Sequence, residues 1–116
     1  MTDTSQSVSV VTAFGAAWAA HDLDKALSMT TDDCLFESTG PAPDGLQHKG
    51  RDAIRQAWQP IFADTDSRFE VEESIAFGDR VVERWVYSWN SGHIRGVDVF
   101  KVRDGKVSEK LAYVKG

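Results

Sequence analysis

The feature that most constrains the fold is a change in the spacing of apolar residues near Asp66. Before this point, apolar residues recur at the spacing of a helix; after it, they alternate with polar residues, as in β-strands. Short turn sequences divide the second half at Gly78-Asp79, Asn90-Ser91-Gly92 and Asp104-Gly105. We therefore predict four consecutive antiparallel strands over residues 68–77, 80–90, 94–103 and 106–114.

The first half predicts three helices and one strand. Residues 8–20 carry an apolar helical stripe, and the seven residues before them are expected to fray. Asp22 is a suitable cap for a second, short helix. Residues 34–38 read as a strand, and 39–50, which contain two prolines, as a loop. The third helix begins at Arg51 and has the clearest stripe: Ile54, Ala57, Trp58, Ile61 and Phe62. Helices followed by a meander predict an α+β fold with the helices on one sheet face.

Length and composition limit the classes of protein. A chain of 116 residues has room for one core, so we expect a single domain over residues 1–116. Its net charge of −5, with no basic stripe, argues against a nucleic-acid partner. No apolar run reaches the roughly 18 residues of a membrane span. The polar start lacks a signal peptide, and Cys34 is the only cysteine, so we expect a cytoplasmic location and no metal or other cofactor.

Both faces of the strand at 80–90 are apolar. One face carries Val81, Glu83, Trp85, Tyr87 and Trp89, and the other carries Val82, Arg84, Val86 and Ser88. Three short helices cover only one side of a sheet, so the other side needs a partner. We place Trp85, Tyr87 and Trp89 on this outer side and predict a homodimer through it; in the alternative, these rings pack against loops or stay half exposed.

The chain resembles the superfamily of nuclear transport factor 2, ketosteroid isomerase and the SnoaL-like polyketide cyclases, which is also described as cystatin-like. The resemblance extends over residues 8–116 and is carried by His21-Asp22-Leu23, by residues 31–37 and 50–54, and above all by RGVDVFKVRDGKVSEK at 95–110. It implies a cone-shaped, curved antiparallel sheet with three N-terminal helices packed on its concave face. In this family the helices and that face enclose a deep apolar pocket.

The resemblance also implies roles for single positions. The late-strand acid of the isomerase and cyclase sites matches Asp98, whereas Phe14, Ser38 and Trp58 stand where the isomerases have a tyrosine, the general base and a second tyrosine. Steroid isomerisation by the usual route is therefore not expected. Arg84 matches the arginine of the limonene-epoxide hydrolases, but Val86 and Ala112 replace their two aspartates, which argues against that hydrolysis as well.

Asp98 and Arg84 are the candidate catalytic residues. A buried Asp98 carboxyl can donate a hydrogen bond or move a proton, and Arg84 can hold an oxygen of the ligand. In the alternative, the two side chains simply pair with each other across adjacent strands. The expected ligand-binding residues are the Ser38 hydroxyl, as a hydrogen-bonding group, and a set of apolar side chains that in the alternative fill the core: Phe14, Trp18, Phe36, Trp58, Phe62, Val86, Phe100, Ala112 and Val114. His21, His48 and His93 have no metal spacing and are expected at the surface or at caps.

Three functions remain compatible with these residues. The first is a cofactor-independent isomerase, cyclase or lyase acting by acid–base chemistry on a small apolar carbonyl compound. The second is a non-catalytic module that binds a small ligand in the same pocket. The third is a dimerising scaffold with a filled interior. An open cavity with an unpaired Asp98 favours the enzyme, an open and purely apolar cavity with Asp98 locked to Arg84 favours the binding module, and a filled interior favours the scaffold.

Overall fold

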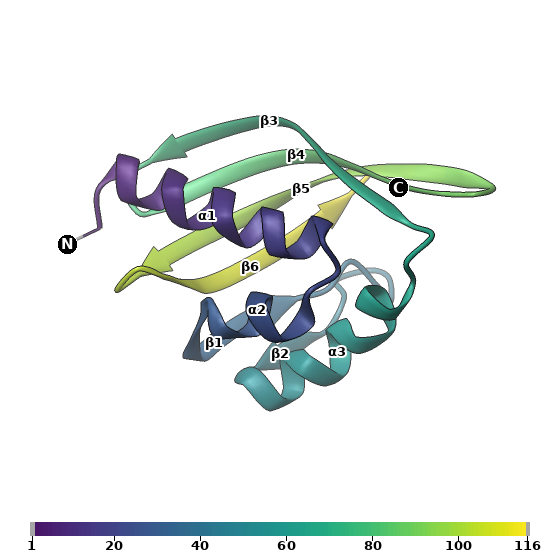
Figure 1. Ribbon diagram of the computed structural model, residues 1–116, viewed down its shortest axis with the longest axis horizontal. Helices are drawn as coiled ribbons and strands as arrows, with labels where there is room; N and C mark the ends of the chain where they lie inside the picture. Colours follow the sequence, from purple (N-terminus) through teal and green to yellow (C-terminus); the bar gives the residue numbers. More distant parts are fainter. Residues whose placement is uncertain (1, 116) are drawn as a thin grey trace.

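The computed structural model describes residues 2–115. These residues fold around a curved six-stranded sheet (Figure 1). The helices are α1 (Thr4–Ala19), α2 (Leu23–Ser28) and α3 (Arg51–Ala63). The strands are β1 (Thr30–Glu37), β2 (Gln47–Lys49), β3 (Arg68–Phe77), β4 (Arg80–Trp89), β5 (Gly92–Arg103) and β6 (Lys106–Val114). Their order across the sheet is β2-β1-β6-β5-β4-β3.

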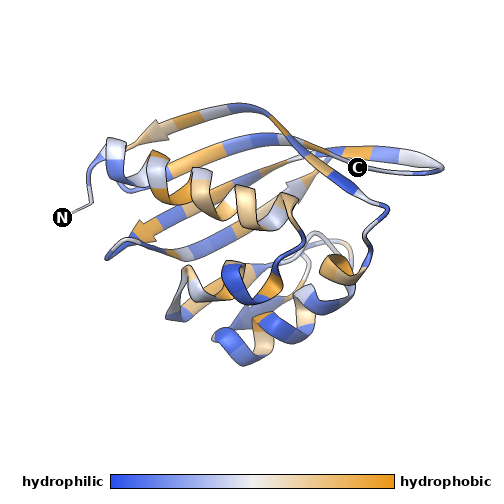
Figure 2. Ribbon diagram, in the orientation of Figure 1, coloured by the Kyte–Doolittle hydropathy of each residue, from blue (hydrophilic) through white to orange (hydrophobic). Residues whose placement is uncertain are grey.

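The helices pack against two parts of the sheet. α1 lies across strands β3 to β6, whereas α2 and α3 pack near β1 and β2 (Figure 1). Figure 2 shows apolar residues alternating with polar ones along the strands. The apolar positions that face the helices form one core centred on Phe14, Trp58 and Phe100, each of which is almost fully buried. The predicted α+β fold is confirmed.

Two features of the sheet differ from the prediction. β1 pairs with β6 in the parallel direction, so the sheet is mixed and not wholly antiparallel. β2 lies inside the segment 39–50, which we predicted to be a loop, and pairs with β1. β1 and β6 lie far apart in the sequence, and β1 and β2 are joined by the long segment 38–46 and not by a short hairpin turn. Neither pairing therefore has a local sequence signal.

α1 begins at Thr4, four residues before the expected start. The Asp3 side chain accepts a hydrogen bond from the Gln6 amide and caps the helix. Ser7 is fully buried, and its hydroxyl donates to the Gly78 carbonyl in the β3–β4 turn at 2.6 Å. The prediction of fraying is therefore wrong for residues 4–7, because this turn holds the first turn of the helix.

Strand register fixes which side chains face the helices. Glu83 lies opposite Asp98, and Trp85 lies opposite Gly96, so all of these positions belong to the concave face. Arg84 and Val86 belong to the convex face by alternation. Placing Trp85 and Tyr87 on the outer face was wrong, since both line the interior. Trp89 lies at the end of the β4–β5 hairpin and is partly exposed, with its indole nitrogen donating to Ser91.

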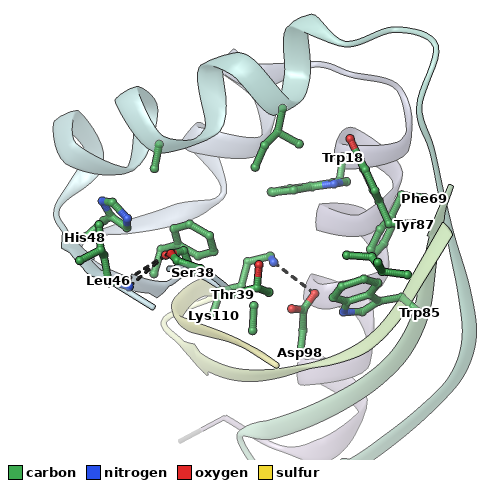
Figure 3. A pocket seen from close by; sticks show the side chains of 16 residues that line it. Trp18, Ser38, Thr39, Leu46, His48, Phe69, Trp85, Tyr87, Asp98 and Lys110 are labelled. Carbon is green, nitrogen blue, oxygen red and sulfur yellow. Dashed lines mark hydrogen bonds and ion pairs between the residues drawn. The ribbon is translucent and has the colours of Figure 1, made fainter. Parts of the chain in front are cut away.

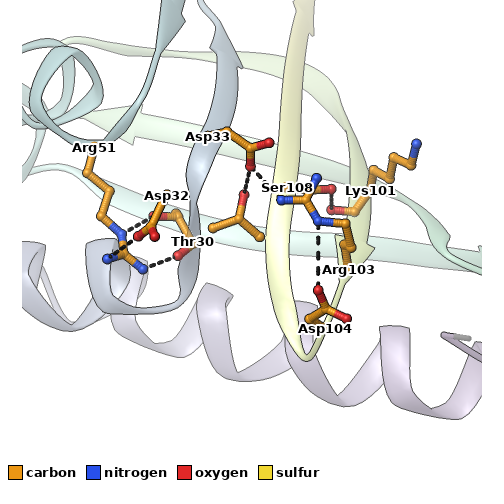
Figure 4. A network of polar contacts seen from close by, with 9 residues as sticks. Thr30, Asp32, Asp33, Arg51, Lys101, Arg103, Asp104 and Ser108 are labelled. Carbon is orange, nitrogen blue, oxygen red and sulfur yellow. Dashed lines mark hydrogen bonds and ion pairs between the residues drawn. The ribbon is translucent and has the colours of Figure 1, made fainter.

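Ion pairs connect the ends of several elements (Figure 4). Arg51 of α3 pairs with Asp32 at 2.9 Å and also donates to the Thr30 backbone carbonyl. Arg103, next to the β5–β6 turn, donates to Asp33 of β1 at 2.5 Å. These contacts tie β1 to the third helix and to the last hairpin.

Candidate active site

A cavity of about 390 Å³ lies between the helices and the concave face of the sheet (Figure 3). Its walls are mainly aromatic, with rings from α1, β1, β3 and β4: Trp18, Phe36, Phe69, Trp85 and Tyr87. Polar groups gather in two places. Asp98 and Lys110 lie at one end, and His48 and Ser38 lie toward the other (Figure 3). Such a cavity suits a flat, mostly apolar molecule with few polar atoms.

Asp98 and Lys110 form a buried ion pair. The Lys110 Nζ lies 3.1 Å from the Asp98 Oδ2, and the two residues are 5% and 0% exposed. Neither carboxylate oxygen of Asp98 accepts a hydrogen bond from the described residues, so the Lys110 charge is its main compensation. Because a desolvated charge is costly without its partner, each of these groups depends on the other.

The Lys110 ammonium also lies among aromatic rings. Its Nζ is 4.6 Å from the Trp18 ring centroid, 5.3 Å from Phe36 and 5.9 Å from Phe100. Ring faces attract a cation, and such a contact contributes about 0.5–2 kcal/mol depending on desolvation. Carboxylate and rings together hold the ammonium at the end of the cavity, with its remaining N–H groups available to a ligand.

A second carboxyl lies behind Asp98. Glu83 is 5% exposed, and the Ser74 hydroxyl donates to its Oε2 at 3.3 Å. Burial raises the pKa of Glu83, and the nearby negative charge of Asp98 raises it further. The concave face thus holds two carboxyl groups and one ammonium on three neighbouring strands, β4, β5 and β6.

Comparisons with known proteins match this architecture. A profile of the SnoaL-like domain family matches residues 11–110. The chain belongs to this family. An NTF2-like protein of unknown function from Mesorhizobium loti is 36% identical, with a TM-score of 0.89 over 97% of this chain and 93% of that one. No curated protein matches the chain.

Two more distant structures share the fold of this SnoaL-like domain. A proposed ketosteroid isomerase from Kribbella flavida is 16% identical, with a TM-score of 0.83 over 100% of this chain and 82% of that one. Rv0760c from Mycobacterium tuberculosis, solved with estradiol-17β-hemisuccinate, is 21% identical, with a TM-score of 0.78 over 93% and 92% of the two chains. At these identities the likeness concerns the fold.

Arg84 lies outside this cavity of the SnoaL-like domain. It lies on the convex face, is exposed, and donates to Glu73 at 3.1 Å. The pairing with Asp98, which was the alternative reading of these two residues, is also absent, because Arg84 lies opposite Val97 while Asp98 lies opposite Glu83. Neighbouring residues of a strand point to opposite faces, so a pair on adjacent strands needs the same face, which these two do not share.

The expected ligand-binding residues divide into three groups. Trp18, Phe36, Ser38 and Ala112 line the cavity together with Asp98. Behind them, in the packed core of the SnoaL-like domain, lie Phe14, Trp58, Phe62 and Phe100. Val86 is on the convex face, and Val114 lines a separate surface hollow with Arg84 and Arg95. The core was thus larger, and the set of wall residues smaller, than the sequence suggested.

Lys110 and His48 are site residues that the sequence analysis missed. Lys110 is two residues before Ala112 on the same strand, so the face expected for Ala112 was the signal that places Lys110 in the interior. His48 lines the cavity from β2, where its ring stacks on Phe36 with centroids 5.5 Å apart. We expected it at the surface because β2 was read as loop.

The other candidate groups are not placed for chemistry. Cys34 is buried, and burial raises the pKa of its thiol to about 12, which keeps it protonated. Within residues 2–115, no three histidine, cysteine or acidic side chains are grouped so as to hold a metal ion. No helix in this range is long and apolar enough to cross a membrane.

Proposed function

We propose that this SnoaL-like domain binds a small, mostly apolar carbonyl compound and moves a proton next to its carbonyl group without a cofactor. Asp98 takes and returns the proton, and Lys110 holds the carbonyl oxygen. The observation that carries the proposal is the buried Asp98–Lys110 pair at the end of an aromatic cavity. Lys110 takes the role that we first gave to Arg84.

The proposed step needs only these two side chains. The ligand oxygen accepts a hydrogen bond from Lys110, which turns part of the ammonium away from Asp98. Asp98 then removes a proton from the carbon next to the carbonyl, and the electrons of that C–H bond move onto the oxygen to give an enolate. The enolate charge is compensated by Lys110. Return of the proton to another carbon gives an isomer. Replacement of the proton on Asp98 by one from solvent, followed by transfer to the original carbon, gives exchange.

A matched pair of compounds tests the binding part. 2-Acetylnaphthalene and 2-isopropenylnaphthalene have the same shape, but only the first has a carbonyl oxygen. We expect calorimetric titration to give tighter binding of the ketone, by about tenfold for one charge-assisted hydrogen bond. Lys110→Met removes this preference, and Arg84→Met, on the convex face, keeps it. Absence of binding by either compound would contradict the proposed pocket function.

Exchange of the methyl protons of 2-acetylnaphthalene in D₂O tests the catalytic part. We expect the wild type to accelerate deuterium incorporation, followed by proton NMR, and Asp98→Asn to reduce the acceleration by about 10²- to 10⁴-fold, as for loss of a general base. Asp98→Asn keeps the size of the side chain, so ketone binding serves as its control.

The second candidate is a binding module without turnover. It is favoured by the complete burial of both Asp98 oxygens, and it is supported by two relatives by fold, namely Rv0760c with its bound estradiol derivative and a computationally designed binder of 17-OHP. Ketone binding with no acceleration of exchange, in the wild type and in Asp98→Asn alike, selects this candidate.

We also propose a homodimer through the convex face, with residues other than those first expected. Ile75, Phe77 and Tyr113 on this face are 60%, 87% and 50% exposed. Arginines and glutamates alternate around them, in the pairs Arg84–Glu73 and Arg95–Glu72. A surface with apolar residues and both charges is suited to meet its own copy across a two-fold axis. A cytoplasmic location also stays a prediction.

Sedimentation velocity tests the dimer. We expect Phe77→Glu to convert a dimer to a monomer, because it places a charge in the apolar part of the interface. Val8→Glu, at an exposed position of α1, is the matched control and leaves the dimer intact. A monomeric wild type at about 100 µM, well above the concentration at which a micromolar dimer forms, would contradict the proposal.

A further inference from the structure

Glu83 is a buried ionisable residue that takes no part in the proposed reaction. It lies on β4 opposite Asp98 of β5, and directly opposed residues on one sheet face have Cβ atoms about 5 Å apart. It does not line the cavity, so Asp98 separates it from any ligand. Contact with the ligand therefore does not explain why a carboxyl group is buried at this position.

The surroundings of Glu83 contain no cation of its own. Its hydrogen-bond partner is the Ser74 hydroxyl of β3, and no basic side chain among residues 2–115 lies within ion-pair distance. The charged groups that act on it are Asp98 of β5 and Lys110 of β6. From α1, which covers this part of the sheet, the buried residues are Ser7, Val11, Phe14, Ala17 and Trp18, none of them ionisable.

Charge counting then points to a stored proton. If both carboxyls were ionised, three buried side chains would carry one positive and two negative charges. A desolvated site disfavours this excess, and the proton stays on the carboxyl without a cation, which is Glu83. We propose that Glu83 is a positioning residue that holds one proton behind Asp98, so that Lys110 compensates a single anion at each stage of the reaction.

The role of this proton rests on the proposed function. In the resting site the single anion is Asp98. After proton transfer Asp98 is neutral, and the single anion is the ligand oxygen. An ionised Glu83 would share the Lys110 charge in both stages and weaken its hold on the oxygen. Glu83 thus acts through Asp98 and Lys110, without touching the ligand.

Carboxyl ¹³C NMR of the ligand-free wild type tests the stored proton directly. We expect the Glu83 carboxyl signal to titrate clearly above the ordinary glutamate range of about 4.3. Glu83→Gln identifies the signal by its loss and keeps the shape of the side chain. Titration of Glu83 within the ordinary range would overturn the inference, whether or not the protein binds a ketone.

The pH dependence of deuterium exchange tests the role. We expect the wild-type rate to fall where the Glu83 signal titrates, and Glu83→Gln, which is always neutral, to lack this fall. Glu73→Gln, at an exposed glutamate on the convex face, keeps the wild-type profile. An identical fall in wild type and Glu83→Gln overturns the positioning role while the proposed function stands. Absence of exchange in the wild type overturns the role together with the proposed enzyme, while the NMR result on the proton remains.

Discussion

The two faces of the sheet treat similar charged residues in opposite ways. On the concave face, Asp98 and Lys110 are almost fully buried and lie among aromatic rings. On the convex face, Glu73 and Arg84 also form an ion pair, and the nitrogen–oxygen distance is 3.1 Å in both pairs. About half of each of these two side chains is exposed. Distance alone therefore does not distinguish a candidate site from a surface ion pair.

The difference lies in the solvent. Exposed pairs are screened by water, and their net contribution to stability is about 0–1 kcal/mol. A buried pair has lost its hydration, so removal of one partner leaves a charge that nothing compensates. The desolvation of the concave pair is thus costly, and this cost is consistent with the proposed use of the two charges by a ligand.

The largest expected effect on stability comes from removing one partner of the buried ion pair. Lys110→Met leaves Asp98 buried without a cation and should lower the free energy of unfolding by about 3–5 kcal/mol. Arg84→Met leaves Glu73 in water and should lower it by about 1 kcal/mol or less. Urea unfolding at neutral pH measures both. Equal losses would mean that the two faces do not differ as we argue.

A double variant serves as control for the size of the side chains. Asp98→Leu combined with Lys110→Met replaces the buried pair by apolar groups, and such replacements are often neutral or stabilising. We expect the double variant to recover most of the stability lost in Lys110→Met. If the double variant instead loses as much free energy of unfolding as Asp98→Leu and Lys110→Met lose separately when added together, packing and not charge causes the effect.

Much of the fold followed from the sequence because the signals were local. The turn at Asp104-Gly105 has two residues in the left-handed region, with φ of 55° and 75°, as the Asp-Gly sequence predicts. The helical stripe through Ile54 and Trp58 likewise matches α3. The parallel pairing of β1 with β6 joins segments about 75 residues apart, and no local pattern indicates it.

The site was harder to predict because the two faces of β4 look alike. Val81, Glu83 and Trp85 alternate with Val82, Arg84 and Val86, so each face has two apolar residues and one charge. The alternation of apolar residues predicts the strand but not which of its faces points inward. A shift of one position moves every inward side chain to the outer face and every outer side chain to the inner face. Asp98 was placed correctly in the interior; its partner was sought on the wrong face.

Gly96 provides a smaller test, at the concave surface. A Cβ atom at this position would lie 2.3 Å from the Tyr113 carbonyl oxygen and 2.7 Å from the Trp85 ring, so the indole can cover β5 only because Gly96 has no side chain. We expect Gly96→Ala to cost about 1–3 kcal/mol, as for overpacking, and to weaken ketone binding.

Gly15 of α1 is the matched control for Gly96. A Cβ atom there meets nothing within 4 Å, and alanine in a helix is favoured over glycine by about 0.5–1 kcal/mol. Gly15→Ala should therefore raise the free energy of unfolding. Opposite signs for the two substitutions would support the close packing of Trp85 on β5, and a neutral Gly96→Ala would contradict it.

The smallest expected effect concerns pH, where the two faces should differ in sign. On the concave face, burial raises the pKa of Glu83, so the folded state binds its proton more tightly than the unfolded state. This contribution to stability is complete below the ordinary glutamate value of about 4.3 and is lost as the pH rises through the folded pKa. Glu83→Gln should therefore lose less stability than the wild type as the pH rises above about 4.

Asp33, on the convex side of β1, should behave in the opposite way (Figure 4). Hydrogen bonds from Arg103 and Thr31 lower the pKa of its carboxyl to about 2. Its contribution is present above the ordinary aspartate value of about 3.9 and is lost as the pH falls toward the folded value. In a plot of the free energy of unfolding against pH, Asp33→Asn should thus reduce the slope only below the ordinary aspartate pKa. Glu83→Gln should reduce the slope only above the ordinary glutamate pKa. Urea unfolding at a series of pH values measures both slopes, and parallel curves for wild type and Glu83→Gln above about pH 4 would mean that Glu83 ionises as freely inside the fold as in water.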